Sequence, residues 1–106
     1  MPDFETAFTT CPLVAILRGL RPAEALDHGK ALTDAGFTLL EVPLNSPDPL
    51  DSIARLTKGL PDAIIGAGTV RTPADVGAVA QAGGRLIVAP NFAPDVAAEA
   101  KRLGLI

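Results

Sequence analysis

The sequence has few of the features that would place the protein outside the cell or in a membrane. Its 106 residues include one cysteine, Cys11, so the chain cannot form an internal disulfide. No asparagine lies in a usable glycosylation sequence, because Asn45-Ser46 is followed by Pro47. The first dozen residues, MPDFETAFTTCP, carry acids and no long apolar stretch, so we expect neither a signal peptide nor a membrane span. These absences predict a soluble protein of the reducing cytoplasm.

Clustered charge and clustered metal ligands are also missing. The net charge is −3 and the nine basic residues form no basic cluster, which argues against binding to nucleic acid or to an anionic membrane. The single histidine, His28, lies among Ala and Leu and is interpreted as a surface or packing residue. No group of His, Cys and Asp has metal-ligand spacing, so we predict no metal site and no cofactor.

Short apolar runs alternate with alanine-rich stretches along the chain. The apolar content of 48% in 106 residues suits one modest domain with a real core. Each apolar run is too short for a helix and suits a strand buried on both faces. The four predicted strands span residues 13–17, 39–42, 63–67 and 86–89.

Proline and glycine mark the predicted helices between these strands. A proline stands where each helix would begin, and a glycine where it would end in a left-handed cap. The prolines are Pro22, Pro47, Pro73 and Pro94, and the glycines are Gly36, Gly59, Gly83 and Gly104. Ser46 and Thr72 are predicted helix caps, whereas Arg21 and Ala93 are poor ones. The resulting four strand–helix repeats predict an α/β fold with a parallel sheet and right-handed crossovers.

One carboxylate interrupts the second apolar run, LLEVPLNSP. Glu41 stands among residues fit for a buried strand, where a bare carboxylate costs several kcal/mol unless it is paired, hydrated or protonated. A weak internal repeat aligns AGFTLLEVPLNSPD (35–48) with AGGRLIVAPNFAPD (82–95) and places Glu41 opposite Val88. The architecture therefore accepts an apolar residue there. An edge strand with Glu41 facing water is the alternative to a functional carboxylate.

Two parallel folds compete for this pattern. GAGTVR (66–71) invites a dinucleotide-binding reading, but it follows the third strand and lacks a downstream acid at the right distance. A (β/α)8 TIM barrel fits better, because polar residues gather at the carboxyl ends of the strands, where such barrels carry their active sites. A whole barrel needs about 250 residues, so this chain supplies about the first four βα units. We expect an N-terminal extension or helix over 1–11 and the four units over 12–106.

A half-barrel has exposed edges. The first and fourth strands would be open, and residues of the inner face such as Leu39 and Val88 would meet water. The isolated chain is therefore expected to dimerise, to aggregate or to await its other half.

Four motifs together resemble a known enzyme family. PLVAILRGL, AGFTLLEVPLNSP, IIGAGTV and LIVAPN are similar to the N-terminal half of the bacterial 2-keto-3-deoxy-6-phosphogluconate and phosphogalactonate aldolases. The resemblance implies a homotrimeric cytoplasmic class I aldolase built on a TIM barrel. Such enzymes need no cofactor and cleave a keto-deoxy sugar acid phosphate, a small-molecule substrate, to pyruvate and glyceraldehyde 3-phosphate through a lysine Schiff base.

The resemblance also implies roles for individual residues. Glu41 matches the family's general acid–base, while Arg18 and Thr69 match residues that hold the pyruvoyl end. Asn45 stands where the gluconate branch usually has a second arginine, which favours the galactonate branch, and Pro90 completes the implied substrate-binding set. The Schiff-base lysine is expected beyond Ile106.

The lysines of the chain agree with this last expectation, because Lys30, Lys58 and Lys101 all lie on predicted helices.

Other interpretations remain open at this point. Arg18 could be a surface or capping arginine, Thr69 a turn residue, and Pro90-Asn91 a simple turn. The chain could also belong to a gluconate-specific aldolase, to another phosphate-handling barrel enzyme such as an epimerase or synthase, or to a non-catalytic half-barrel module.

Overall fold

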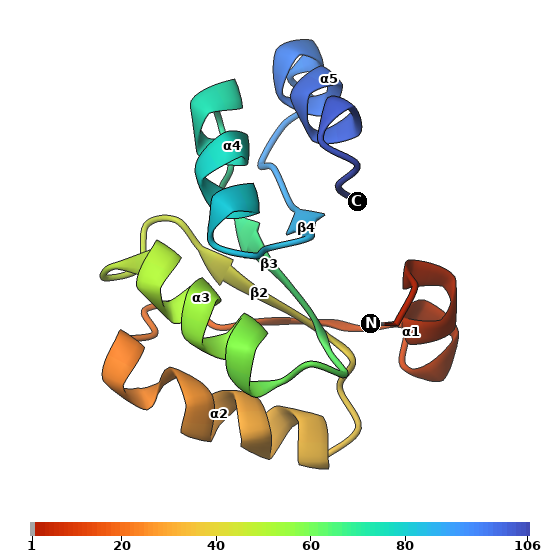
Figure 1. Cartoon of the computed structure of the whole chain (residues 1–106), viewed down its shortest axis with the longest axis vertical. Coiled ribbons are helices and arrows are strands. Elements are labelled where there is room, and N and C mark those ends of the chain that lie inside the picture. The colour runs from red at the N-terminus through yellow and green to blue at the C-terminus, as the bar shows by residue number, and fades with distance from the viewer. Residues whose placement is uncertain (1) are drawn as a thin grey trace.

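Strands and helices alternate along the chain, as the prolines and glycines predict. A computed structural model of the protein describes residues 2–106. The strands are β1 (Val14–Ile16), β2 (Leu39–Pro43), β3 (Ile64–Gly68) and β4 (Leu86–Ile87). The helices that follow them are α2 (Pro22–Asp34), α3 (Pro49–Gly59), α4 (Pro73–Gln81) and α5 (Pro94–Arg102). A further helix, α1 (Phe4–Thr10), precedes β1 (Figure 1).

The four strands form one parallel sheet in the order β1-β2-β3-β4. Its register places Leu39 beside Val14 and Ile64, and Glu41 beside Ile16 and Gly66. Sequential parallel order with a helix after each strand is the arrangement of the βα units of a barrel, and it differs from a doubly wound sheet.

The larger core lies between the sheet and the helices that follow its strands. Leu40 and Val42 of β2 are fully buried and belong to a cluster that includes Ile53 of α3 and Val76 of α4. Because side chains alternate along a strand, Leu39 and Glu41 point to the opposite face, as the sequence predicts.

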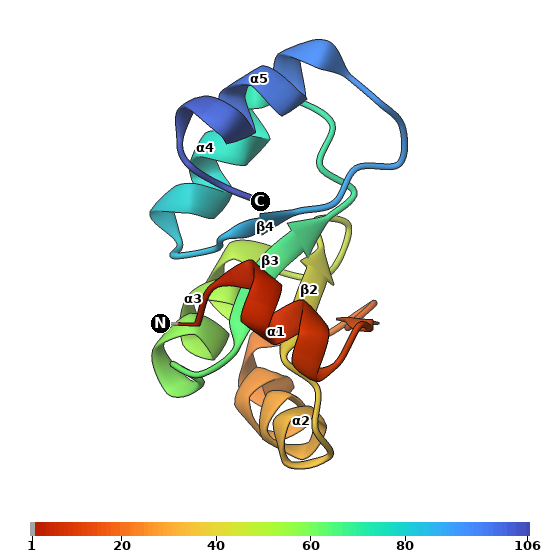
Figure 2. The ribbon, with the colours of Figure 1, turned by 90° about the vertical axis from the view of Figure 1, so that its right-hand side faces the viewer.

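Helix α1 covers part of that opposite face. Ala7 packs with Leu39, Ile64 and Leu86 in a second cluster, and Figure 2 shows α1 lying across the strands. Leu39 is fully buried, so the prediction that it would meet water is wrong. Val88 is half-buried against the same cluster. Helix α1 therefore supplies apolar surface over this face through Ala7 and the partly buried Phe4.

The two sheet edges differ. Along β1, Val14 and Ile16 are 38% and 58% exposed, and this edge is open as predicted. At the other edge, Ile106 donates a hydrogen bond from its N–H to the carbonyl of Arg85 and accepts one from Ile87, both at 2.8 Å. The prediction of an open fourth strand is therefore wrong at this point, because the end of the chain returns to pair with it.

Two predicted helix boundaries also need correction. Helix α3 begins at Pro49, not Pro47, because Asp48 precedes a proline and takes a left-handed conformation with φ 42°. Gly59 is the last residue of α3 and has no positive φ. A Cβ at position 59 would lie 2.3 Å from Cδ1 of Leu26, so this glycine permits close packing of α2 against α3. Thr72 caps α4 as predicted, accepting a hydrogen bond from the N–H of Asp75 at 3.1 Å.

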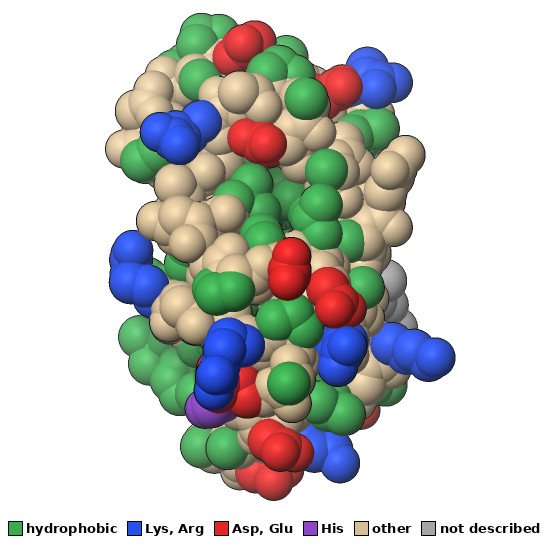
Figure 3. All heavy atoms as spheres, turned by 90° about the vertical axis from the view of Figure 1, so that its left-hand side faces the viewer, with side chains coloured by type: hydrophobic (Ala, Val, Ile, Leu, Met, Phe, Trp, Pro, Cys, Tyr) green, Lys and Arg blue, Asp and Glu red, His purple; other side chains and the backbone are tan. Residues whose placement is uncertain are grey.

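The helical surface carries both signs of charge. Figure 3 shows acidic and basic side chains interspersed over one face of the molecule. Within residues 2–106 no helix is long and apolar enough to cross a membrane.

Candidate functional site

The candidate site lies at the carboxyl end of the sheet, where β1, β2 and β3 end side by side. Arg18 follows β1, Glu41 stands in the middle of β2, and Thr69 follows β3. Because the strands are parallel and in sequential order, these residues lie toward the same end of the sheet, the carboxyl end of its strands. Glu41 comes from the middle strand of the three, and its backbone carbonyl accepts a hydrogen bond from the N–H of Leu17 at 2.9 Å.

Glu41 is a buried carboxyl group with an unused hydrogen-bonding atom. Its side chain is 4% exposed, and within the described residues its Oε2 atom has no hydrogen-bond partner. Loss of hydration raises the pKa of Glu41, and the positive charge of Arg18 lowers it in part. A carboxyl group with a raised pKa gives and takes protons closer to neutral pH than an ordinary carboxyl group does. This burial rules out the edge-strand alternative, in which Glu41 would face water.

Gly68 makes room for this carboxyl group. A Cβ built at position 68 would lie 2.2 Å from Oε2 and 2.5 Å from Oε1 of Glu41, far inside van der Waals contact. Any other residue would displace the carboxylate. Sequence reasoning missed Gly68, although a glycine in a strand, here at the last position of β3, is a known signal of close approach.

Thr69 continues directly from Gly68 in an unusual conformation. Its φ of 56° is left-handed, which is uncommon for a β-branched residue and costs of order 1–3 kcal/mol. Hydrogen bonds on both sides fix it: Leu44 donates to the carbonyl of Gly68 at 2.9 Å, and Val70 donates to the carbonyl of Val88 at 3.2 Å. The half-buried Thr69 side chain is therefore held at the end of β3. Backbone strain of this kind is typical of functional sites.

Asn45 and Pro90 lie in exposed loops at the same end of the sheet, after β2 and β4 respectively. Arg18 is exposed as well. The positive charge of Arg18 acts on the pKa of Glu41. Asn45 and Pro90 instead lie at the solvent-facing rim.

Ser46 was predicted as the cap of α3 and has a different role. Its side chain is 6% exposed, and its Oγ accepts a hydrogen bond from the N–H of Gly19 at 3.1 Å. The sequence offered one signal for this, a serine between Asn45 and Pro47, and that signal is equally typical of a helix cap.

The lysines lie away from this site. Lys30, Lys58 and Lys101 are exposed on α2, α3 and α5. In the described part of the chain, no three His, Cys, Asp or Glu side chains are placed to hold a metal ion.

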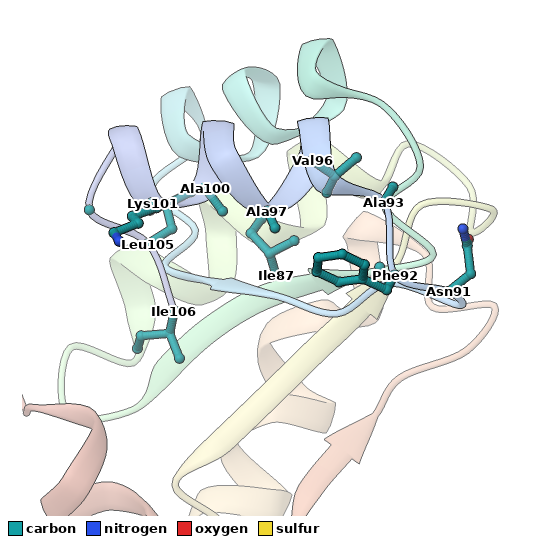
Figure 4. A pocket seen from close by; sticks show the side chains of 12 residues that line it. Ile87, Asn91, Phe92, Ala93, Val96, Ala97, Ala100, Lys101, Leu105 and Ile106 are labelled. Atoms are coloured by element: carbon teal, nitrogen blue, oxygen red, sulfur yellow. The ribbon is translucent and has the colours of Figure 1, made fainter.

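An apolar groove lies elsewhere, between β4 and α5. It has a volume of about 470 Å³ and is lined mainly by apolar side chains, among them Ile87, Val96 and Ile106 (Figure 4). Phe92, which is 79% exposed, lies at its mouth. With one lining lysine and no acid, this groove offers packing surface, whereas the candidate site holds the buried carboxyl group of Glu41.

Comparison with known proteins agrees with the geometry. The family model for KDPG and KHG aldolase matches residues 4–105. The chain is 51% identical over 96 residues to a probable 2-dehydro-3-deoxy-6-phosphogalactonate aldolase of Rhizobium meliloti (strain 1021), covering 90% of the chain and 45% of that protein. It is 35% identical over 88 residues to a KHG/KDPG aldolase of Escherichia coli (strain K12), covering 83% of the chain and 41% of that protein.

The fold matches a solved structure described as "Native KDPGal structure". The TM-score is 0.87 at 47% identity, and the match covers 89% of this chain and 46% of the other. The chain thus spans about half the length of the proteins it matches. Its four parallel βα units correspond to that share of a TIM barrel.

Proposed function

The chain belongs to the KDPG and KHG aldolase family, and on this premise we propose that it carries the acid–base half of a class I aldolase active site. The observation that supports the proposal most is Glu41, a buried carboxyl group with a raised pKa at the mouth of a half-barrel. A carboxyl group in this state is suited to repeated proton transfer.

In this proposal Glu41 is the general acid–base. Imine chemistry needs protons moved at three points: carbinolamine dehydration, deprotonation of the substrate hydroxyl, and protonation of the enamine. The partly desolvated carboxyl group would supply each transfer. Arg18 offers a planar guanidinium that matches the carboxylate of pyruvate. Thr69 would hold the pyruvoyl end from the neighbouring strand.

The Schiff-base lysine is proposed to come from outside these residues. A lysine that forms an imine at neutral pH needs a buried amine beside its acid–base partner. Lys30, Lys58 and Lys101 are all exposed on helices. We therefore propose that residues 1–106 form the N-terminal half of one barrel domain, and that the open β1 edge and the groove beside β4 receive the other four βα units. The completed enzyme is proposed to be a cytoplasmic homotrimer.

The proposed substrate is 2-keto-3-deoxy-6-phosphogalactonate, cleaved reversibly to pyruvate and glyceraldehyde 3-phosphate. Sequence identity supports this choice, because the chain is 51% identical to the probable phosphogalactonate aldolase and 35% identical to the KHG/KDPG aldolase. Asn45 in place of an arginine supports it too, and with Pro90 it lines the proposed substrate rim. The gluconate substrate is the second candidate.

Joining the chain to the second half of the Rhizobium relative would test this proposal. The assay measures aldol cleavage of each of the two sugar acid phosphates by the amount of glyceraldehyde 3-phosphate released. We expect Glu41→Gln to lower turnover by about 10²- to 10⁴-fold, the usual loss for a positioned acid–base. Glu5→Gln on the exposed surface of α1 is the matched control and should leave turnover unchanged. Near wild-type turnover in Glu41→Gln would remove Glu41 from the mechanism.

A further inference from the structure

One buried hydroxyl joins the loop that carries Arg18 to the loop that follows β2, the strand of Glu41. Ser46 lies just after β2, and Gly19 lies in the loop after β1, 27 residues earlier in the chain. The Ser46 Oγ accepts a hydrogen bond from the N–H of Gly19 at 3.1 Å. The N–H of Ser46 itself donates to the carbonyl of Pro43 at 3.0 Å, which fixes the serine to the end of β2.

This hydroxyl has no part in capping a helix. Helix α3 begins at Pro49 and its N-cap is Asp48, two residues beyond Ser46. A buried hydroxyl keeps its place when it satisfies a polar group, and here that group is the amide of Gly19.

The loop held by Ser46 is the one that presents Arg18. Gly19 has a φ of 74°, and the N–H of Leu20 donates to the carbonyl of Leu17 at 3.4 Å, so Arg18 lies within a tight turn. Arg18 is exposed, and its backbone is the part of it that the fold can fix. The hydrogen bond to Ser46 comes from Gly19, the residue that follows Arg18 in the chain.

We propose that Ser46 is a positioning residue: it ties the Arg18 turn to the end of β2 and so fixes the backbone from which the Arg18 guanidinium acts on the Glu41 carboxyl group. The positive charge of Arg18 lowers the pKa of Glu41 against the effect of burial. The catalytic meaning of this arrangement rests on the proposed function, whereas the arrangement itself does not.

The chain offers a matched control. Ser52 on α3 is also a buried serine, at 0% exposure, but within residues 2–106 its Oγ has no hydrogen-bond partner. Ser46→Ala and Ser52→Ala therefore remove the same atom from two buried sites, and only the first change breaks a link between loops.

Carboxyl-detected NMR titration of Glu41 in the joined enzyme, in which the second half of the Rhizobium relative completes the chain, is the decisive measurement. Ser46→Ala should raise the pKa of Glu41, because the Arg18 charge is no longer held beside it, and Ser52→Ala should leave it unchanged. Exchange of the Gly19 amide proton should accelerate about 10-fold, the loss of one ordinary hydrogen bond. In an Arg18→Gln background Ser46→Ala should have no further effect on the pKa of Glu41, since the charge that it positions is absent.

Three results would overturn the proposal. The first is a pKa of Glu41 that Ser46→Ala leaves unchanged. The second is an equal shift with and without Arg18, and the third is a Ser46→Ala chain that fails to fold where Ser52→Ala folds. None of these involves aldolase activity, so they are distinct from a failure of the proposed function. In the joined enzyme, Ser46→Ala should raise KM for pyruvate by about 3- to 10-fold with little change in kcat.

Discussion

The carboxyl group of Glu41 occupies the space that a side chain at position 68 would fill. Its two oxygens lie 2.2 and 2.5 Å from the place of a Cβ on Gly68. The acid on β2 and the glycine on β3 are therefore one structural unit. Gly68 belongs to the GAGTVR stretch that invites a dinucleotide-binding reading, and in the structure it leaves room for the buried acid of the neighbouring strand.

Gly68→Ala should displace the Glu41 carboxyl group. The added methyl group overlaps both oxygens, so we expect a loss of about 1–3 kcal/mol in the free energy of unfolding, as for overpacked cores. Chemical denaturation measures this loss, and the Glu41 carboxyl resonance reports the displacement. Gly77→Ala in α4 is the control, because a Cβ there has no other atom within 4 Å and should stabilise the helix by about 0.5–1 kcal/mol. Equal stabilities for the two variants would contradict the steric account.

Glu41→Gln should change the pH dependence of stability. Burial raises the folded-state pKa of Glu41 above its ordinary value of 4.5, so the folded state binds the proton more tightly than the unfolded state does. The wild-type chain therefore loses stability as the pH rises from 4.5 through the folded-state pKa, and this loss is absent at lower pH. Glutamine cannot ionise, so the variant should lack this loss and be the more stable protein at neutral pH. The measurement compares denaturation curves of the joined enzyme with and without Glu41→Gln from pH 4 to 8, and a parallel pH dependence in the two proteins would show that Glu41 has no raised pKa.

Arg18→Ala should weaken pyruvate binding in the condensation direction. Loss of a charged hydrogen bond predicts a rise in KM of about 10- to 100-fold. Folding should change little, because Arg18 is exposed. The reference variant is Arg102→Ala, which removes an exposed arginine paired with Glu99 on α5 and should leave pyruvate kinetics alone. Unchanged pyruvate kinetics in Arg18→Ala would show that Arg18 is a surface arginine with no role in pyruvate binding.

The 106-residue chain by itself should associate and should be inactive. Ile16 and Phe92 are 58% and 79% exposed, and each apolar side chain left in water forfeits up to about 1.5–3 kcal/mol of a typical stability of about 5–15 kcal/mol. Sedimentation at micromolar concentration should show dimers or larger species. Pyruvate with borohydride should leave the mass of the chain unchanged, because its lysines are exposed on helices. A soluble monomer with cooperative unfolding would count against the half-barrel.

The sequence alone determined the order and type of the main elements. Prolines at helix starts, glycines after helix ends and short β-branched runs act within a few residues, so α2, α4 and α5 begin at the predicted prolines. Local chemistry also identified Glu41 as an exceptional residue, because a carboxylate between apolar strand residues is costly wherever the strand is buried.

Only the tertiary structure decided how that acid is accommodated. The burial of Leu39 under α1, the space at Gly68 and the Ser46 link to Gly19 join residues 27 to 32 positions apart in the chain. Asn45-Ser46-Pro47 is equally compatible with a helix cap and with a bridge between loops, since both use one hydroxyl as an acceptor. Local preference cannot separate the two, because the deciding partner is an amide that the fold brings within 3.1 Å.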